Sequence, residues 1–524
     1  MIRLAAIFKD NMVIQREKNV RIFGYCNPED SIEVKMEEIR VQAEKKIQGD
    51  RAYFEAVLPP MKAGGPYLLT VDSEYEECLI HNVMVGEVWL AGGQSNMELE
   101  LQNSADGAQV VAGMKKQPIR FYQVPRIGFV GEELDEAEEN TCWQECDAQT
   151  VGTWSAVGYY FASRLAGELS GVTVGVIGCN WGGTSASCWM SEESLAACRE
   201  TQIFLDEYQD AMAGKTLEEY KQEKAEYEIY HAEWERKSQE YYATHENPAW
   251  CDVIAYAGEN RWPGPMGPEN EYRPAGLYKS MIQRIVPYTL GGVIFYQGES
   301  DDGKPRQYYT LFQNMISHWR EIFKNDKLPF YFVQLPMFMN AGDEDYKNWP
   351  LIREAQMRVY EKLKHTGIVV ALDCGEFNNI HPLDKKSVGY RLADQVLYGE
   401  FGRKDISAFG PIYREYAVEG DSVRIFFDYA ENGFIQTGDA VNGFEIAGED
   451  KVFYPAQAGV DKNTVFVHSP MVARPVYVRY LWTNYAPVEL FGKCGLPAAP
   501  FRTSMEDESS DEVASSGVQY GTTV

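Results

Sequence analysis

The chain has 524 residues, of which 45% are hydrophobic and 24% charged, a composition ordinary for a globular protein. Because single hydrophobic cores stop growing near ~250–300 residues, this length predicts more than one domain. Asp and Glu (78) outnumber Lys and Arg (49), and the net charge of −29 argues against nucleic acid and anionic membranes as partners.

Signals for targeting and for cofactors are weak. No apolar run approaches the ~18 residues of a membrane span, and the N-terminus lacks the apolar core and cleavage site of a signal peptide. Ten cysteines are scattered along the chain without zinc-site spacing, and no glycine-rich phosphate loop is present. We therefore expect reduced, mostly buried thiols, a cytoplasmic location, and neither a metal nor an organic cofactor. The sequence leaves open whether the chain forms a homo-oligomer.

The first 82 residues are predicted to form a β domain. Short alternating runs at 20–24 and 31–35 are separated by turn residues, and a Gly-Gly-Pro turn leads into a further strand at 66–71. No helix of any length is indicated, so a small β-sandwich is expected.

Residues 83–405 change to a strand-then-helix pattern. Several of the predicted strands are continuous apolar runs, which suit a parallel sheet buried on both faces. Helices are predicted between the strands, for example at 158–169 and 308–323. The fold class expected here is a three-layer α/β/α domain. The strand candidates are 86–91, 172–179, 292–296, 329–334 and 367–372.

A helical insertion is predicted within this domain at about 192–245. One stripe of rings recurs every seven residues, formed by Tyr220, Tyr227, Trp234 and Tyr241. Packing between two helices is the expected role of this stripe, and a wall of rings facing a sugar ligand is the alternative. Residues 406–503 return to β-like alternation and predict a C-terminal β domain, and the acidic tail at 504–524 is expected to be disordered.

Four motifs stand at the carboxyl ends of predicted strands, the edge where α/β sheets build their sites. The first places Ser95, a candidate nucleophile, two positions after a Gly-Gly turn. The second carries Gly182 and Gly183, whose backbone N–H groups could bind a developing oxyanion. The third contains Gln297 as a further donor, and the fourth contains His381 as a base. Together they supply the groups that acyl transfer requires.

The motifs resemble those of a known family. The order Gln-Ser-Asn-Met (94–97), Trp-Gly-Gly-Thr (181–184), Tyr-Gln-Gly-Glu-Ser (296–300) and Ile-His-Pro (380–382) is similar to the SGNH hydrolases, and more narrowly to the sialate O-acetylesterase family. Further stretches, such as Asp-Asn-Met-Val-Ile-Gln-Arg (10–16) and the closing segment 495–503, extend the resemblance over about residues 4–503. No G-x-S-x-G elbow is present to support an α/β-hydrolase.

The resemblance implies roles for individual residues. Ser95 would be the nucleophile and His381 the general base, with the Ser95 N–H, Gly183 (or, as second choice, Gly182) and Gln297 forming the oxyanion hole. Many SGNH enzymes carry an aspartate three residues before the histidine. Here that position is Asn378, so the chain departs from the pattern.

The group that orients His381 is therefore open. Asp373, Glu376 and Asp384 are nearby in sequence, and a carbonyl is the remaining alternative. A Ser–His dyad is the preferred hypothesis.

Two further residues are candidates for substrate binding. Trp181 could stack on a sugar, although a core position fits equally well, and Glu299 could contact substrate, although a buried hydrogen-bonded role is the more common outcome for such a carboxylate.

The leading hypothesis is an esterase that removes O-acetyl groups from sialic acid or a related sugar. An intracellular acetyl-xylo-oligosaccharide esterase is the first alternative, and a non-catalytic carbohydrate-binding protein is an alternative of another class. A glycosidase is a poorer hypothesis, because nothing indicates a second carboxylate at a defined separation.

Overall fold

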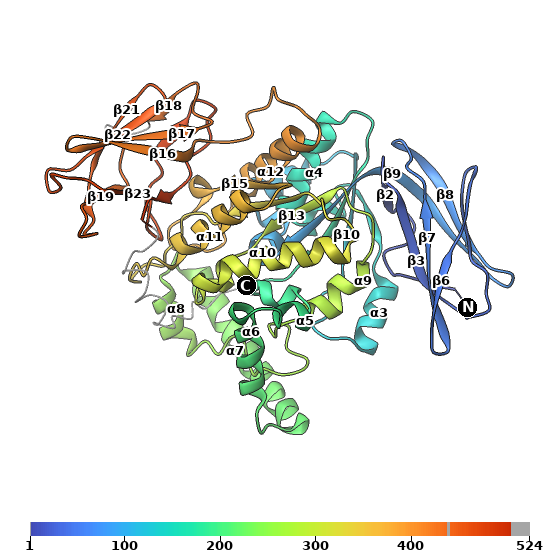
Figure 1. Cartoon of the computed structure of the whole chain (residues 1–524). Coiled ribbons are helices and arrows are strands. Elements are labelled where there is room, and N and C mark those ends of the chain that lie inside the picture. Colours follow the sequence, from blue (N-terminus) through green and yellow to red (C-terminus); the bar gives the residue numbers. More distant parts are fainter. Residues whose placement is uncertain (1, 437–440, 505–524) are drawn as a thin grey trace.

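The computed structural model describes residues 2–436 and 441–504. An α/β unit occupies the middle of the molecule, with a β-rich unit on each of two opposite sides (Figure 1). The N-terminal β unit is blue in Figure 1, and the C-terminal β unit runs from orange to red. The predicted mixed α/β fold with β-rich ends is confirmed. In the described part of the chain, no helix is both long and apolar enough to cross a membrane.

The N-terminal unit consists of two sheets. One has the strand order β1-β3-β7-β6, and the other contains β2, β4, β5, β8 and the start of β9. Strand β7 alternates buried and more exposed side chains, as expected for a strand with one face on a core. The strands are β1 (Arg3–Leu4), β2 (Val13–Gln15), β3 (Val20–Cys26), β4 (Glu33–Met36), β5 (Ile39–Gln42), β6 (Glu44–Gln48), β7 (Arg51–Leu58), β8 (Gly64–Asp72) and β9 (Glu77–Gly93).

Strand β9 belongs to both the N-terminal unit and the central sheet. Its first half pairs antiparallel with β8, and its second half enters the central sheet between two parallel neighbours. One continuous strand of 17 residues therefore runs through residue 83, where the sequence pattern changes. The last nine residues of β9 are all buried, because this half has a neighbour on each edge and layers on both faces.

The central sheet has the order β11-β10-β12-β9-β13-β14-β15 and is parallel except for the edge strand β11. All five strands predicted for this unit are present, and β13 has the predicted bounds. Strands β10 and β11 were not anticipated. The additional strands are β10 (Gln117–Gln123), β11 (Trp143–Cys146), β12 (Val174–Asn180), β13 (Gly292–Tyr296), β14 (Phe330–Gln334) and β15 (Thr366–Val370).

Helices cover both faces of this sheet. Helices α4 (Ala156–Glu168) and α12 (Lys385–Glu400) pack together on one face, and α10 (Pro305–Ile322) and α11 (Asn348–Lys362) pack together on the other (Figure 1). The predicted helices at 158–169 and 308–323 correspond to α4 and α10, so the three-layer arrangement is confirmed. Shorter helices lie in the connections: α1 (Ser95–Glu98), α2 (Gly107–Ala112), α3 (Glu132–Asn140) and α9 (Gln283–Ile285).

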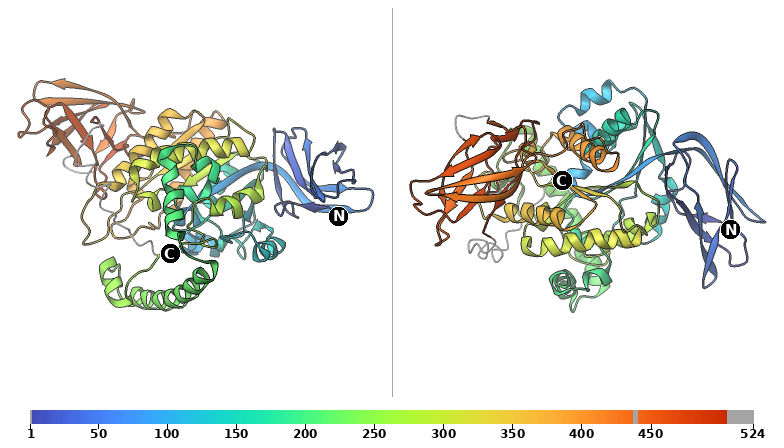
Figure 2. Two further views of the ribbon diagram at one scale, coloured as in Figure 1. Left: turned by 60° about the horizontal axis from the view of Figure 1, so that its bottom comes forward. Right: turned by 45° about the horizontal axis from the view of Figure 1, so that its top comes forward.

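The helical insertion consists of α5 (Glu192–Leu195), α6 (Arg199–Met212), α7 (Leu217–Thr244) and α8 (Trp250–Ala257). It continues past the predicted end at 245, because α8 folds back on α7 (Figure 2, left). Trp234 of the stripe packs edge-on against Trp250, and Tyr241 contacts Tyr256. The stripe therefore packs between helices, as expected, and part of it also borders a cavity described below.

The C-terminal unit is built from short antiparallel strands around its own core. The predicted β character of 406–503 is present, whereas the predicted disorder of 504–524 falls, except for Ser504, on residues outside the described part. The strands are β16 (Ile412–Glu419), β17 (Ser422–Asp428), β18 (Phe434–Gln436), β19 (Phe444–Ala447), β20 (Tyr454–Pro455), β21 (Gln457–Asp461), β22 (Thr464–His468), β23 (Tyr477–Tyr480), β24 (Leu490–Gly492) and β25 (Phe501–Arg502).

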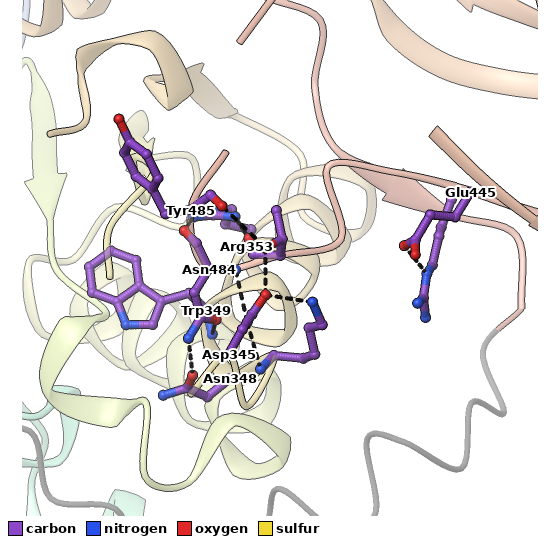
Figure 3. A network of polar contacts seen from close by, with 10 residues as sticks. Asp345, Asn348, Trp349, Arg353, Glu445, Asn484 and Tyr485 are labelled. Atoms are coloured by element: carbon purple, nitrogen blue, oxygen red, sulfur yellow. Dashed lines mark hydrogen bonds and ion pairs between the residues drawn. The ribbon is translucent and has the colours of Figure 1, made fainter. Parts of the chain in front are cut away.

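A buried polar network joins this unit to α11 (Figure 3). The Arg353 guanidinium donates to four backbone carbonyls, two in the segment after β14 (Leu335 and Pro336) and two in the C-terminal unit (Thr483 and Asn484). Burial lowers the pKa of Arg353 to about 9, so the side chain stays charged at neutral pH. The loop after β14 leads to the functional site, and this arginine attaches it to the C-terminal unit.

Candidate active site

The four motifs meet at the carboxyl edge of the central sheet. Strands β12, β9 and β13 lie side by side, and the residues that follow them are joined by backbone hydrogen bonds. The Gln94 N–H donates to the Tyr296 carbonyl (3.0 Å), and the Trp181 N–H donates to the Gly93 carbonyl (3.1 Å). The first three motifs, each predicted at the carboxyl end of a strand, thus lie together at one edge of the sheet.

The turn before Ser95 requires glycine. Gly93 has a φ of 138°, and a Cβ atom there would lie 2.1 Å from the Tyr296 carbonyl oxygen. Only glycine fits this close approach. Helix α1 then begins at Ser95, which lies at the sheet edge. Ser95 is 9% exposed.

Ser95 and His381 are in contact although 286 residues separate them in sequence: the Ser95 Oγ atom lies 2.8 Å from the His381 Nε2 atom. Local hydrogen bonds shape the loop that carries the histidine. The His381 N–H donates to the Asn379 Oδ1 atom (3.0 Å), and the Asn379 amide donates to the Glu376 carboxylate (2.8 Å). The serine hydroxyl and the imidazole are therefore placed for proton transfer.

The three carboxylates considered for a triad all have other partners. Asp373 pairs with the Arg391 guanidinium (2.6 Å), Glu376 accepts from Asn379 and from the Leu383 N–H, and Asp384 caps the start of α12. None of them contacts His381. This arrangement supports the dyad hypothesis.

The electrostatic setting keeps His381 neutral. Burial lowers the pKa of His381 to about 4, and the positive charge of Lys385 adds to the effect. At neutral pH the imidazole is thus unprotonated and can accept the Ser95 proton.

Activity should follow the protonation of His381. The imidazole is a base only when unprotonated, so kcat/KM for ester hydrolysis should rise as the pH increases through about 4 and be flat above about pH 6. Lys385→Met should shift this rise to higher pH, because it removes a positive charge that disfavours the imidazolium. The check is a pH profile of kcat/KM with circular dichroism at each pH. A rise centred at neutral pH in the wild type would contradict the assignment.

Amide substitution of each acid tests the dyad. Asp373→Asn, Glu376→Gln and Asp384→Asn, made singly, should each leave kcat within an order of magnitude of the wild-type value, because none of these carboxylates orients His381. Loss of a true third triad member costs on the order of 10⁴ in kcat. A loss of that size in one variant, with its fold intact, would identify a triad acid.

Backbone donors for an oxyanion are present beside the serine. Ser95 begins α1, so its N–H has no partner within the helix. Gly183 has a φ of 74°, and no hydrogen bond engages its N–H among the described residues. The Gly182 N–H, in contrast, donates to the Glu98 carboxylate. These contacts favour Gly183 over Gly182 as the second donor, and the donor role itself stays a prediction.

The expected oxyanion role of Gln297 is wrong. Its amide nitrogen donates to the Asp301 carboxylate (2.6 Å) and to the Thr184 carbonyl (3.2 Å), and the residue is only 1% exposed. Both amide hydrogens are thus used inside the protein. Gln297 instead joins the second and third motifs, because Asp301 also accepts from the Ser185 hydroxyl and the Ala186 N–H.

Glu299 has the buried, hydrogen-bonded role named above as the alternative, and its contact with substrate stays a prediction, because the residue also borders a cavity of about 290 Å³. The residue is 3% exposed, and its carboxylate accepts from the Asn96 amide (2.6 Å). Burial raises the pKa of Glu299 to about 7. The Asn96 amide nitrogen also donates to the Ile380 carbonyl. The Asn96 side-chain oxygen accepts from the ammonium group of Lys385, a residue that is 1% exposed.

Asn96 therefore connects the serine turn to the histidine loop, a role that sequence reasoning missed. Its position next to Ser95 was the only signal available. The role of Lys385 had no signal at all, since a lysine at the start of a helix is normally a surface residue.

Trp181 is half-buried and packs partly against the main core, so its stacking on a sugar stays a prediction. Two cavities lie near the second motif. One of about 290 Å³ borders Gly183 and the rings of Trp262 and Tyr272. The other, of about 270 Å³, lies between the same two rings and α7, where Tyr227 of the stripe lines it. The described residues contain no group of three or more His, Cys, Asp or Glu side chains that could hold a metal ion.

The fold and the site together define a class of protein. A serine hydroxyl in contact with a neutral histidine, at the carboxyl edge of a sheet covered by helices on both faces, is the arrangement of a serine hydrolase. Residues 262–398 match the family model of a carbohydrate esterase described as a sialic acid-specific acetylesterase.

Known proteins match over nearly the whole chain. Sialate O-acetylesterase from Mus musculus is 27% identical over 95% of this chain and 94% of its own length, and the Homo sapiens protein is 25% identical over 97% and 93%. The crystal structure of a carbohydrate acetylesterase from Xanthomonas citri superposes with a TM-score of 0.75 at 28% identity, covering 96% of this chain and 100% of that one. The chain is thus similar to the sialate O-acetylesterases over nearly its whole length, and part of it matches a carbohydrate esterase model.

Proposed function

We propose that the protein is a carbohydrate O-acetylesterase that works through an acetyl-Ser95 intermediate. The Ser95 Oγ atom attacks the acetyl carbonyl carbon while His381 Nε2 takes the hydroxyl proton. The tetrahedral intermediate then collapses, and the sugar oxygen leaves with the proton from His381. Water attacks the acetyl-enzyme with His381 again as the base, so acetate departs and Ser95 recovers its proton.

Charge develops on the acetyl oxygen in both tetrahedral intermediates. The Ser95 and Gly183 N–H groups are the proposed donors to it, because neither has a partner among the described residues. Both belong to turns that hydrogen bonds between the motifs hold in place. No substantial reorganisation is then needed when the charge forms.

The observation that carries this proposal is the 2.8 Å contact between Ser95 Oγ and His381 Nε2. A protein that only bound carbohydrate would not require a hydroxyl and a buried neutral imidazole in hydrogen-bond contact. The named activity of the relatives supports acetylated sialic acid as a substrate, and acetyl-xylo-oligosaccharides stay the alternative. The cytoplasmic location, and the absence of nucleic-acid and membrane partners, stay predictions.

Acetate release from a substrate panel tests the function. The panel contains O-acetylated sialic acids, acetylated xylo-oligosaccharides and acetylated manno-oligosaccharides, with the Ser95→Ala variant as the control for background hydrolysis. We expect Ser95-dependent acetate release from at least one sugar class. Binding of these sugars without any release would favour the carbohydrate-binding alternative.

A further inference from the structure

A third cavity, of about 260 Å³, opens beside His381. The helical insertion forms one wall, through Trp250 and the loop between α7 and α8. The segment after β14 forms another wall through Phe338, and the histidine loop closes the end. Its lining combines aromatic rings with four amide side chains, Asn247, Asn340, Asn378 and Asn379.

Asn378, in the histidine loop, forms hydrogen bonds to the two other walls of the cavity. Its amide nitrogen donates to the carbonyls of Pro248 (2.8 Å) and Asn247 (3.0 Å) and contacts the Asn247 side-chain oxygen (3.2 Å). Its oxygen accepts from the Ala341 N–H (3.0 Å). Many SGNH enzymes carry an aspartate at this position, and these contacts explain why this chain has an asparagine instead. A carboxylate could not donate to the two carbonyls and would be repelled by them.

The cavity has no charged lining. Its residues are asparagines, aromatic rings, Pro248, Ile380 and His381, and the imidazole is neutral because burial lowers its pKa to about 4. Amides both donate and accept, which matches the hydroxyl groups of a sugar. Ring faces such as that of Trp250 match the apolar C–H face of a pyranose. A carboxylate placed here would lose its hydration without gaining a cationic partner.

We propose that this cavity binds the sugar ring that carries the acetyl group, and that it recognises uncharged ring hydroxyls, with Asn378 as the residue that positions its walls. The proposal rests on the esterase function proposed above. The volume lies below the ~300–1,000 Å³ of pockets for drug-sized ligands, which suits one sugar residue. A carboxylate attached to the bound ring would therefore weaken binding, because the cavity lining offers it no cationic partner.

The first experiment compares sugar and non-sugar esters. Trp250→Ala and Asn378→Gly, the latter compatible with the positive φ of 63° at this residue, are assayed with an acetylated methyl glycoside and with p-nitrophenyl acetate. The ratio of kcat/KM for the sugar ester to that for p-nitrophenyl acetate should fall about tenfold, mainly through KM. Tyr256→Ala is the matched control, because this ring also lies on α8 but does not line the cavity, and it should keep the wild-type ratio.

Unchanged ratios in both cavity variants would overturn the proposal, as would equal losses on the two esters, which would indicate damage to the catalytic pair. Failure of the underlying function would differ, because the wild type would then release no Ser95-dependent acetate from any sugar.

The second experiment tests the neutrality of the site. Methyl glucoside and methyl glucuronide, acetylated at the same ring hydroxyl, differ by one carboxylate. We expect at least about a tenfold higher kcat/KM for the glucoside, from the cost of burying an unpaired charge. Equal rates, or a preference for the glucuronide, would overturn recognition by uncharged groups.

Discussion

Ser95→Ala and His381→Ala should each lower kcat/KM for acetyl-ester hydrolysis by about 10⁴–10⁶-fold. Without the Ser95 hydroxyl there is no nucleophile to form the acetyl-enzyme. Without the imidazole, 2.8 Å away, the hydroxyl has no base to take its proton. The measurement is initial-rate kinetics with p-nitrophenyl acetate and with the best sugar ester of the panel.

Two matched variants control for nonspecific damage. Ser317→Ala removes an exposed hydroxyl that bonds only within α10, and His245→Ala removes a histidine stacked on Tyr241 at the end of α7. Both should retain wild-type rates. The folds of all four variants are compared by circular dichroism. Near-normal turnover by either site variant would remove that residue from the proposed mechanism.

Arg353→Ala should strongly destabilise the protein. It leaves four carbonyl oxygens without their donor, three of them in buried hydrogen bonds, and an unpaired buried acceptor costs about 1–3 kcal/mol. We expect a loss of about 4 kcal/mol or more and a drop of about 10 °C in the first melting transition. The C-terminal β unit should also become more sensitive to limited proteolysis, because its attachment to α11 is lost.

Variants of the same helix make this test specific. Arg353→Lys keeps the charge but cannot reproduce the planar fork that reaches several carbonyls, so an intermediate loss is expected. Arg358→Ala removes an exposed arginine of α11 that lies over the Tyr309 ring, and its melting should match the wild type within about 2 °C. If Arg353→Ala melted like Arg358→Ala, the network would not hold the C-terminal unit in place.

Elements with a strong hydrophobic pattern were predictable. Strand β13 and helices α4 and α10 appear where periodicity placed them, since a parallel strand buried on both faces must be apolar throughout. Strand β10 was missed because polar residues interrupt its run: Arg120 is buried there and donates to backbone carbonyls of the N-terminal unit. The partners of this buried arginine lie in another unit of the protein, so the local sequence pattern does not reveal the strand.

Within the site, the strand-end motifs placed the serine, the two glycines and the histidine. They could not show which polar groups face the substrate, and Gln297 and Glu299 illustrate why. Both stand in the right motif, yet their side chains turn inward to Asp301 and Asn96. Whether a side chain at a strand end points out or in depends on which partners the neighbouring strands supply.

Local chemistry in the chain was enough to specify the Gly-Gly turn before Ser95, the alternation of strands and helices, and the need for a histidine in the fourth motif. These features depend on residues a few positions apart, where backbone sterics and hydrophobic period act directly. Three other contacts were decided by the tertiary structure alone. Lys385 is buried and donates to Asn96, and Asp373 forms an ion pair with Arg391. Asn378 connects the histidine loop to the insertion by a hydrogen bond to Pro248. Each of these contacts joins a pair whose partners are 18 to 289 residues apart, so only the folded chain brings them within reach.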